Sequence, residues 1–193
     1  FGTPCESFSI AHRPQLRSRR QLRGLQPPPP GWERYLAKHN ALADWTAALA
    51  RIAYDAGAEF LIENPADRGD ESSAAYWARM RDHAPLWLQP AMLALAEATG
   101  AELITFPQCH LGALVQKYTS VLCTEEAAAQ LADLRGVRCE HEWHAEKAHG
   151  RDAHGRGKAE MAAAYPRQMS ERLARAAEAV AAGAIAARRV AAA

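Results

Sequence analysis

The stretch AEFLIENPADRGD, residues 58–70, decides the fold that the sequence predicts. Its apolar first half is typical of a buried strand, and Asn64-Pro65 ends that strand and leads into a loop. A long helix is predicted before it, over residues 32–56, because apolar side chains recur at spacings of three and four and Gly57 supplies a stop. A second helix is predicted from about Leu86 to Thr99, before Gly100. Four tryptophans at helical spacing are predicted to pack in the core, namely Trp32, Trp45, Trp77 and Trp87.

Two further strands follow the second helix: AELITF, residues 101–106, and YTSVLC, residues 118–123. Strands that alternate with helices are typical of α/β proteins, so the sequence predicts a three-layer, mostly parallel sheet. Ligands bind beyond the carboxyl ends of the strands in such sheets, and Cys5, Glu63 and Gln108 are predicted to lie at strand ends on one rim. A short helix to about Leu134 and a C-terminal helix from about Lys158, interrupted near Tyr165-Pro166, complete the prediction.

The composition is typical of one domain with a local basic patch. The chain has 193 residues, 49% of them hydrophobic, and a formal net charge of +1, so attraction to nucleic acid has to come from such patches. Five arginines form one, with no acidic residue among them: Arg13, Arg17, Arg19, Arg20 and Arg23. The patch is followed by Pro27–Pro30, a stiff extended spacer. Because the chain opens without methionine, we expect it to be part of a longer protein.

The cysteine pattern indicates reduced thiols. Cys5, Cys109, Cys123 and Cys139 form no C-x-x-C pair and no even ladder of the kind that crosslinks small secreted domains. We therefore predict an intracellular protein, located in the nucleus if its source is a eukaryote. No stretch reaches the roughly 18 apolar residues of a membrane span, and no charged-then-apolar leader opens the chain.

Two residues are candidates for covalent chemistry on a ring. Glu63 at the end of a buried strand is partly desolvated, which favours its protonated form and suits a proton donor or a partner for a ring nitrogen. The alternative is a loop cap, because Asn-Pro is a common turn opener. Cys5 follows Pro4 beside the arginines, which would favour its nucleophilic thiolate, although Glu6 opposes this. The alternative for Cys5 is a small buried hydrophobic residue.

A histidine-rich segment after residue 138 is a candidate metal site. Its possible ligands are Cys139, His141, His144 and His149, with His154 beyond them. Thiol and imidazole groups suit zinc, and a small lobe without a core can be held by such a metal. The spacing matches no standard zinc finger, and solvated histidines in a polar loop are the alternative.

Three motifs together resemble the cytosine-5 DNA methyltransferases. The family ends one strand with a Pro-Cys motif, ends the next with Glu-Asn-Val, and carries a glycine followed by Gln-x-Arg-x-Arg before a later strand. This chain has Thr3-Pro4-Cys5, then Glu63-Asn64-Pro65, then Gly112, Gln116, Lys117 and Thr119. Residues 106–120, FPQCHLGALVQKYTS, are similar to a string in shortened methyltransferase-like domains of mobile elements and of algal or phage genomes. The segment AAAYPRQMSERLARA near the end of the chain resembles the C-terminal helix of the family.

The resemblance implies the fold and a set of roles. The fold would be the Rossmann-like sheet of S-adenosylmethionine-dependent methyltransferases, incomplete at its N-terminus. Cys5 would add to carbon six of a cytosine flipped out of DNA, Glu63 would hold the ring, Asn64 and Lys117 would assist, and S-adenosylmethionine would supply the methyl group. The residues implied to bind the DNA substrate are Pro4, Ser7, Arg13, Arg17, Arg19, Arg20, Arg23, Pro65, Arg68, Gln108 and Gln116.

One methyltransferase-like domain, 1–193, is therefore expected. It would comprise the catalytic motif with the basic loop in 1–30, an α/β core in 31–124, a His-rich small lobe in 125–157 and a C-terminal helix in 158–193. The chain departs from the family because nothing corresponds to the glycine-rich cofactor loop, and because Glu6 stands where the family has glutamine after Pro-Cys. A catalytically inactive nucleic-acid-binding or zinc-stabilised module of a mobile element is the alternative function.

Overall fold

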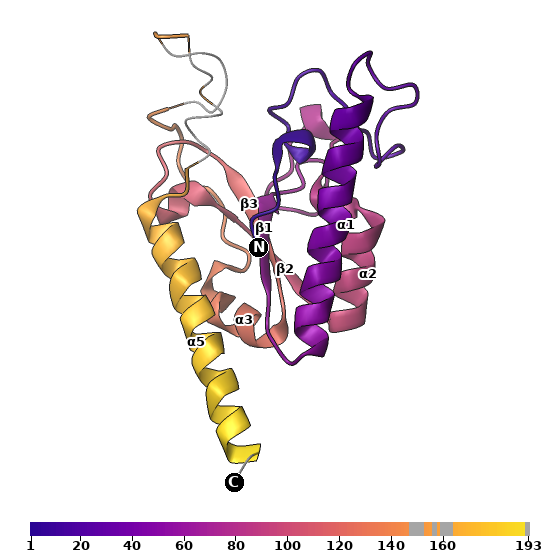
Figure 1. Ribbon diagram of the computed structural model, residues 1–193. Coiled ribbons are helices and arrows are strands. Elements are labelled where there is room, and N and C mark those ends of the chain that lie inside the picture. Colours follow the sequence, from indigo (N-terminus) through magenta and orange to yellow (C-terminus); the bar gives the residue numbers. More distant parts are fainter. Residues whose placement is uncertain (147–152, 156–157, 159–163, 192–193) are drawn as a thin grey trace.

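A computed structural model describes residues 1–146, 153–155, 158 and 164–191. One small sheet lies between two helical layers (Figure 1). Its strands are β1 (Leu61–Pro65), β2 (Glu102–Pro107) and β3 (Tyr118–Cys123). The helices are α1 (Glu33–Asp55), α2 (Pro90–Thr99), α3 (Glu125–Gln130) and α5 (Arg167–Ala191). Short 3-10 helices include η1 (Glu6–Phe8), η2 (Ala78–Met80), η3 (Leu86–Leu88), η4 (Gln108–Leu111) and η5 (Ala132–Leu134).

The sheet has the strand order β1-β3-β2, and β3 runs antiparallel to both of its neighbours. In its register, Thr119 of β3 lies opposite Pro65 of β1 and Phe106 of β2. The predicted three-layer, mostly parallel Rossmann-like sheet is therefore wrong for the described part of the chain. The physical reason is the connection between β2 and β3. Parallel neighbours need a crossover of about a dozen residues or more, usually a helix, whereas residues 108–117 supply only η4 and a loop.

The positions of the elements agree with the sequence pattern better than the sheet type does. The predicted helices over 32–56 and 86–99 are confirmed as α1 and as η3 followed by α2. Gly57 and Gly100 follow these helices with φ angles of +79° and +65°, a left-handed conformation that favours glycine at a helix end. The C-terminal helix begins at Arg167, just after Pro166. Apolar spacing and the positions of glycine and proline therefore predicted where the helices and strands lie, but not the directions of the strands.

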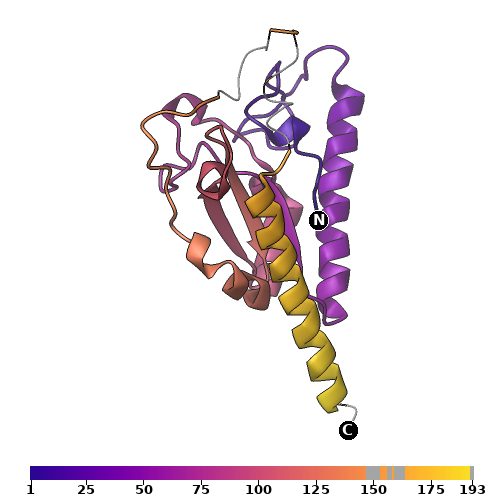
Figure 2. The ribbon, with the colours of Figure 1, turned by 90° about the vertical axis from the view of Figure 1, so that its left-hand side faces the viewer.

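Helices α1 and α2 cover one face of the sheet (Figures 1 and 2). The core on this side includes Ile62 of β1 and Leu122 of β3, packed against a helical surface that includes Ala43, Ala47 and Ala50 of α1. Small alanine side chains let the helix approach the sheet closely. Trp87 is buried here and donates its indole N–H to the Pro65 carbonyl at 2.9 Å.

Helices α3 and α5 cover the opposite face, where α5 crosses the sheet in Figure 2. Its core includes Ile104 and Phe106 of β2, Val121 of β3, and Met169 and Ala176 of α5. Alternate residues of each strand therefore face the two layers, as the two-residue period of a strand requires. Glu63, Pro65 and Thr119 belong to the α5 face at the end where β1 finishes.

The expected burial of all four tryptophans is wrong for two of them. Trp45 is 70% exposed and Trp77 is 39% exposed. The buried stripe of α1 includes Leu36, Ala43 and Ala50, and Trp45 lies off that stripe. Apolar residues at helical spacing on α1 thus form two stripes, and only one faces the sheet.

Candidate active site and metal centre

The first three residues run beside β1 and carry Cys5 to its end. Gly2 and Glu63 form a parallel bridge, in which the Glu63 amide donates to the Phe1 carbonyl at 3.1 Å. The buried Asn64 side chain donates from Nδ2 to the Thr3 carbonyl at 2.8 Å. The structure therefore brings the Pro-Cys and Glu-Asn-Pro motifs together, although they lie about 60 residues apart in sequence. Asn64 contacts the Cys5 segment as a positioning residue.

The Glu63 carboxylate accepts hydrogen bonds at both of its oxygens. Thr119 Oγ1 donates to Oε1, and the Tyr165 hydroxyl donates to Oε2. Burial, followed by the hydrogen bond to Glu63, raises the pKa of Tyr165, so its phenol stays protonated at neutral pH. Three segments, namely β1, β3 and the residues just before α5, thus fix this carboxylate. A ligand that hydrogen-bonds Glu63 would compete with the Tyr165 hydroxyl for Oε2.

The Cys5 thiol is half-buried beside Glu63 and Lys117. Burial raises its pKa above the usual value of a thiol, Lys117 lowers it, and Glu63 and Glu6 raise it further. The cation that favours the thiolate is therefore Lys117 rather than the neighbouring arginines. The Lys117 ammonium also lies 5.9 Å from the centre of the Tyr165 ring. We name the group of Cys5, Glu63, Lys117, Thr119 and Tyr165 the Cys5–Glu63 site.

Tyr165 is the member of this site that sequence reasoning missed. Its place before Pro166 indicated only an interruption of the C-terminal helix. A tyrosine at the start of an amphipathic helix carries no local sign that its hydroxyl will meet a carboxylate 102 residues earlier. The resemblance of this segment to the family's C-terminal helix was the one available signal.

The five arginines play different roles from one another. Arg17 is only 2% exposed and donates to the Leu22 carbonyl at 2.6 Å, to Asn40 Oδ1 at 2.7 Å and to Ser7 Oγ at 3.1 Å. Burial lowers the pKa of Arg17 to about 10. These contacts make Arg17 and Ser7 parts of the loop framework, which leaves neither side chain available to a phosphate in this conformation.

Acidic residues from elsewhere in the chain pair with two other arginines. Arg19 contacts Asp67 at 2.5 Å, and Arg23 forms two hydrogen bonds to Asp44 at 2.7 and 2.8 Å. Arg13 and Arg20 are exposed, and Arg13 donates to nearby backbone carbonyls. The basic patch is therefore smaller in the folded protein than in the sequence.

The remaining predicted DNA contacts are scattered around the same end of the sheet. The Arg68 guanidinium lies 5.1 Å from the Tyr118 ring and 5.8 Å from the Trp77 ring. Gln108 is buried at the start of η4, whereas Gln116 and Pro4 are exposed. Pro65 contributes the carbonyl that Trp87 binds. Their contact with DNA stays a prediction.

Four side chains gather into a cluster that could hold a metal ion. The donor atoms of Cys109, Cys139, His141 and His144 all lie within 4.8 Å of one another. The Cys139 sulfur lies 3.5 Å from that of Cys109, 3.3 Å from His144 Nε2 and 3.6 Å from His141 Nδ1. Ligands at about 2.0–2.3 Å around a tetrahedral metal have mutual separations of about 3.3–3.8 Å, so the shorter contacts of the cluster match a metal centre.

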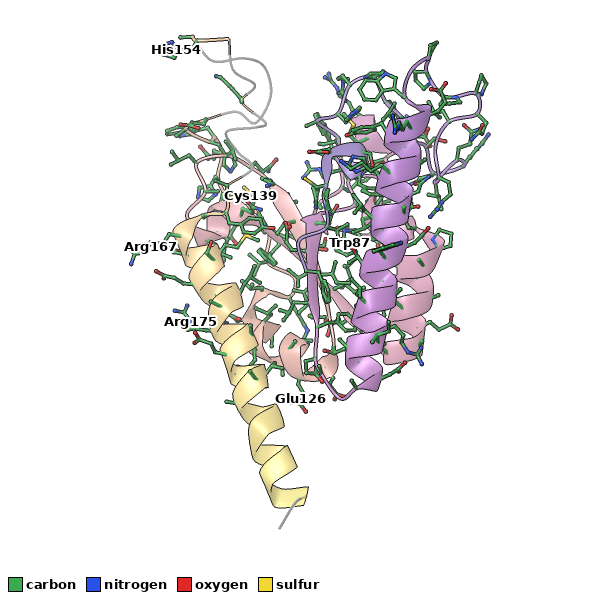
Figure 3. All side chains as sticks on the ribbon, viewed as in Figure 1. Trp87, Glu126, Cys139, His154, Arg167 and Arg175 are labelled. Carbon is green, nitrogen blue, oxygen red and sulfur yellow. The ribbon has the colours of Figure 1, made fainter. Side chains whose placement is uncertain are left out.

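The cluster joins two distant segments of the chain. Cys109 comes from η4, directly after β2, and the other three ligands come from the segment between η5 and α5. Figure 3 shows Cys139 on the side of the sheet that α5 covers, away from the layer that holds Trp87. Three of the predicted ligands are present, Cys109 is an addition, and His149 lies outside the described residues. Sequence spacing missed Cys109 because it lies 30 residues before Cys139.

The two cysteines of the cluster differ in acidity. Burial raises the pKa of Cys109 to about 11. Burial also acts to raise the pKa of Cys139, but hydrogen bonds involving His141, Gln116 and Cys109 lower it below the usual value of a thiol. The half-exposed Cys139 is therefore the ligand that loses its proton first.

The described residues do not form a site for S-adenosylmethionine. The loop after β1 holds the Arg19–Asp67 ion pair, and the loop after β2 holds Cys109 of the metal cluster. Neither loop presents the glycine-rich turn at a helix N-terminus with which the family binds its cofactor. The cofactor expectation is thus unsupported by the part of the chain that is described.

Comparison with known proteins identifies no relative, since no family model, no characterised protein and no solved structure matches the chain. Among the described helices, none combines the length and apolar character needed to cross a lipid bilayer. The function has to be argued from the Cys5–Glu63 site and the metal cluster.

Proposed function

We propose that the Cys5–Glu63 site binds a cytosine flipped out of DNA and that the function of the protein is methylation of this base at carbon five. The observation that supports the proposal is that the segment carrying Cys5 pairs with β1 through the Gly2–Glu63 bridge, while Lys117 lies over the Tyr165 ring. The hydroxyl of that ring binds Glu63, and Lys117 and Glu63 both influence the thiol. A thiol, a carboxylate and an ammonium group are the three functions that conjugate addition to a pyrimidine needs.

Each residue has a defined part in the addition. The Cys5 thiolate forms a bond to carbon six of the ring, and the electron pair of the ring double bond moves to carbon five. Glu63 accepts a hydrogen bond from the exocyclic amino group, and a proton taken up from solvent is shared between its carboxylate and the ring nitrogen, which stabilises the electron-rich adduct. Lys117 stabilises the thiolate before the attack. Thr119 orients the carboxylate.

The adduct has one fate that needs no cofactor. Carbon five takes a proton from water, the original hydrogen leaves as a proton, and the electron pair then expels the Cys5 thiolate and restores the cytosine. Atoms and electrons balance, and the net result is exchange of the carbon-five hydrogen with solvent. Methylation itself would need residues that the described part of the chain does not supply.

The exchange gives a direct test of the proposal. DNA carrying tritium at carbon five of cytosine is incubated with the full chain, and the tritium released into water is counted. We expect release by the wild-type protein, loss of release in Cys5→Ala and Glu63→Gln, and retention in Cys123→Ser, whose thiol is buried in the α5-side core. Absence of release by the wild type, with DNA binding intact, would defeat the proposal and favour the inactive nucleic-acid-binding alternative.

We also propose that the metal held by the cluster is zinc and that its role is structural. Two thiolates and two imidazoles are a closed four-ligand set that zinc prefers, and no position is left for a reacting water. The ligand segment, residues 137–144, has no helix or strand of its own, so a metal would hold it to the sheet.

Cobalt substitution tests this second proposal. Tetrahedral Co²⁺ with thiolate ligands has intense visible and near-ultraviolet absorption bands, which added Zn²⁺ removes when it displaces the cobalt. We expect these bands in the wild-type chain and in His110→Ala, because the exposed His110 is adjacent to Cys109 but outside the cluster. Cys109→Ser should weaken the sulfur-to-metal band. Absence of the bands at stoichiometric Co²⁺ would contradict the proposed centre.

A further inference from the structure

Three consecutive residues at the start of β3 contact the segments that carry the metal ligands. Although burial acts to raise the pKa of the Cys139 thiol, the Gln116 side chain acts on this thiol and lowers its pKa. The Lys117 carbonyl accepts from the amide of Gln108, the neighbour of Cys109, at 2.7 Å. The Tyr118 hydroxyl accepts from the Cys139 amide at 3.0 Å. Residues 116–118 are therefore held between the two ligand segments.

Lys117, the middle residue of these three, belongs to the Cys5–Glu63 site. The Lys117 side chain extends to the Tyr165 ring and acts on the Cys5 thiol, while Thr119, the next residue but one, donates to Glu63. The position of the Lys117 ammonium thus depends on a short piece of backbone whose other contacts lead to the metal ligands. Tyr118 is buried, which fixes its part of this backbone.

The ligand segment has little apolar packing of its own. Val137 packs against the α5-side core and Cys139 against a small cluster that includes Tyr118, whereas Trp143, between two ligands in sequence, is 74% exposed. A segment with few buried apolar contacts has low local stability unless covalent or metal bonds hold it. Bonds to a metal in the cluster would consequently be the strongest connection between the ligand segment and the start of β3.

We infer that the metal bound by Cys109, Cys139, His141 and His144 positions Lys117 beside Cys5, so that metal occupancy controls the reactivity of the Cys5 thiol. This inference rests on the proposed zinc centre and on the proposed role of Cys5. Among the described residues, the charged groups that act on Cys5 are Lys117, Glu63 and Glu6, and the phenols of Tyr35 and Tyr165 lie close enough to interact with its thiolate. Lys117 is the cation among them, and it is the one whose backbone contacts the ligand segments.

Alkylation of Cys5 provides the test, because it needs neither DNA nor a cofactor. The full chain, zinc-loaded or treated with a chelator, reacts with iodoacetamide at one fixed pH, and mass spectrometry of peptides measures the rate at each cysteine. We expect metal removal to slow alkylation of Cys5 by about threefold to tenfold, because the thiolate fraction falls as Lys117 moves away. Lys117→Met should slow Cys5 equally in the zinc-loaded protein and abolish the effect of the chelator. Lys38→Met, an exposed lysine of α1, serves as the matched control.

Cys123 reports on global unfolding within the same experiment, because it is fully buried in the core. If Cys123 stays protected while Cys5 reacts at the same rate with and without metal, the inference is overturned. If chelation exposes Cys123, the decisive variant is Gln116→Ala, which removes the side chain that acts on Cys139 and keeps all four ligands. This variant should retain zinc and slow the alkylation of Cys5, and an unchanged Cys5 rate at full zinc content would overturn the inference.

Failure to retain zinc in the wild type would instead defeat the zinc proposal, and failure of tritium release would defeat the cytosine proposal.

Discussion

Replacing Tyr165 with phenylalanine should have two effects of opposite sign. The substitution removes the hydroxyl that donates to Glu63 Oε2 and keeps the ring that lies over Lys117. The folded protein loses a hydrogen bond, so its free energy of unfolding should fall. Because a cytosine no longer has to displace that hydroxyl, its binding at Glu63 should become stronger.

The size of both effects follows from the exposure of the bond. A hydrogen bond to a charged group contributes about 1.5–3 kcal/mol. Tyr165 is 40% exposed, so water competes for the carboxylate and we take about 1 kcal/mol as the net value. The free energy of unfolding should therefore drop by about 1 kcal/mol, and the DNA concentration that half-saturates tritium release should drop about fivefold.

Urea unfolding followed by circular dichroism measures the first effect, and tritium release at graded DNA concentrations measures the second. Tyr76→Phe is the matched control, because the Tyr76 hydroxyl donates to the Glu71 carboxylate at 3.2 Å on an exposed loop outside the site. It should leave DNA saturation unchanged. A Tyr165→Phe protein that needs more DNA for half-saturation would show that Tyr165 assists base binding, and the reasoning about displacement would be refuted.

Three further predictions concern the framework of the site. Phe106→Ala should lower the free energy of unfolding by about 3–5 kcal/mol because Phe106 is fully buried, whereas Leu103→Ala, at a 40%-exposed position of the same strand, should cost far less in urea unfolding. Although burial acts to raise the pKa of Asp67, the adjacent His83 ring, the hydrogen bond from the Gly69 amide and the charge of Arg19 lower it below the usual value. Its stabilisation is therefore complete above the unfolded pKa of about 3.9 and is lost as the pH falls through the lower folded value, so Asp67→Asn should flatten the decline of thermal stability below about pH 4. Arg17→Met should lower the unfolding temperature because it removes the hydrogen bond to Asn40, whereas Arg20→Met, at an exposed position, should leave that temperature unchanged. If Arg20 contacts a phosphate, Arg20→Met should also reduce the logarithmic salt slope of DNA binding by about 0.9.

The sequence located the elements because their signals are local. Apolar spacing identified α1, α2 and the three strands, and the glycines at 57 and 100 identified helix ends. Strand direction is not a local property, because it depends on the length of the connection and on which neighbour a strand joins. An apolar strand pattern such as YTSVLC does not indicate which way the strand runs relative to its neighbours. The alternation of helices and strands was the remaining signal, and it predicted the wrong sheet type.

The candidate site was predicted only in part, because some of its residues are close in sequence whereas others meet only in the folded chain. Cys5 and Glu63 were predicted to lie together because the resemblance supplied the order of their motifs. Three metal ligands were predicted because Cys139, His141 and His144 lie within six residues of sequence. Cys109, Tyr165 and the acidic partners of the arginines are tertiary neighbours. Asp67 is 48 residues from Arg19, and no pattern within the basic loop indicates that it will neutralise that charge. Charge strips read from sequence therefore overstate the basic surface of a folded chain.

The raised pKa of Cys5 agrees with the proposed chemistry once the order of events is considered. Burial and the negative charges of Glu63 and Glu6 keep the thiol protonated in the free protein, with Lys117 as the opposing influence. When a base binds, a proton taken up from solvent is shared between the Glu63 carboxylate and the ring nitrogen, which neutralises much of the negative charge that faces the sulfur. The contribution of Glu63 that raises the pKa of Cys5 then weakens, whereas that of Lys117 remains. We therefore expect the thiolate to form when a base is bound, which would keep the nucleophile inert toward solvent oxidants until its substrate arrives.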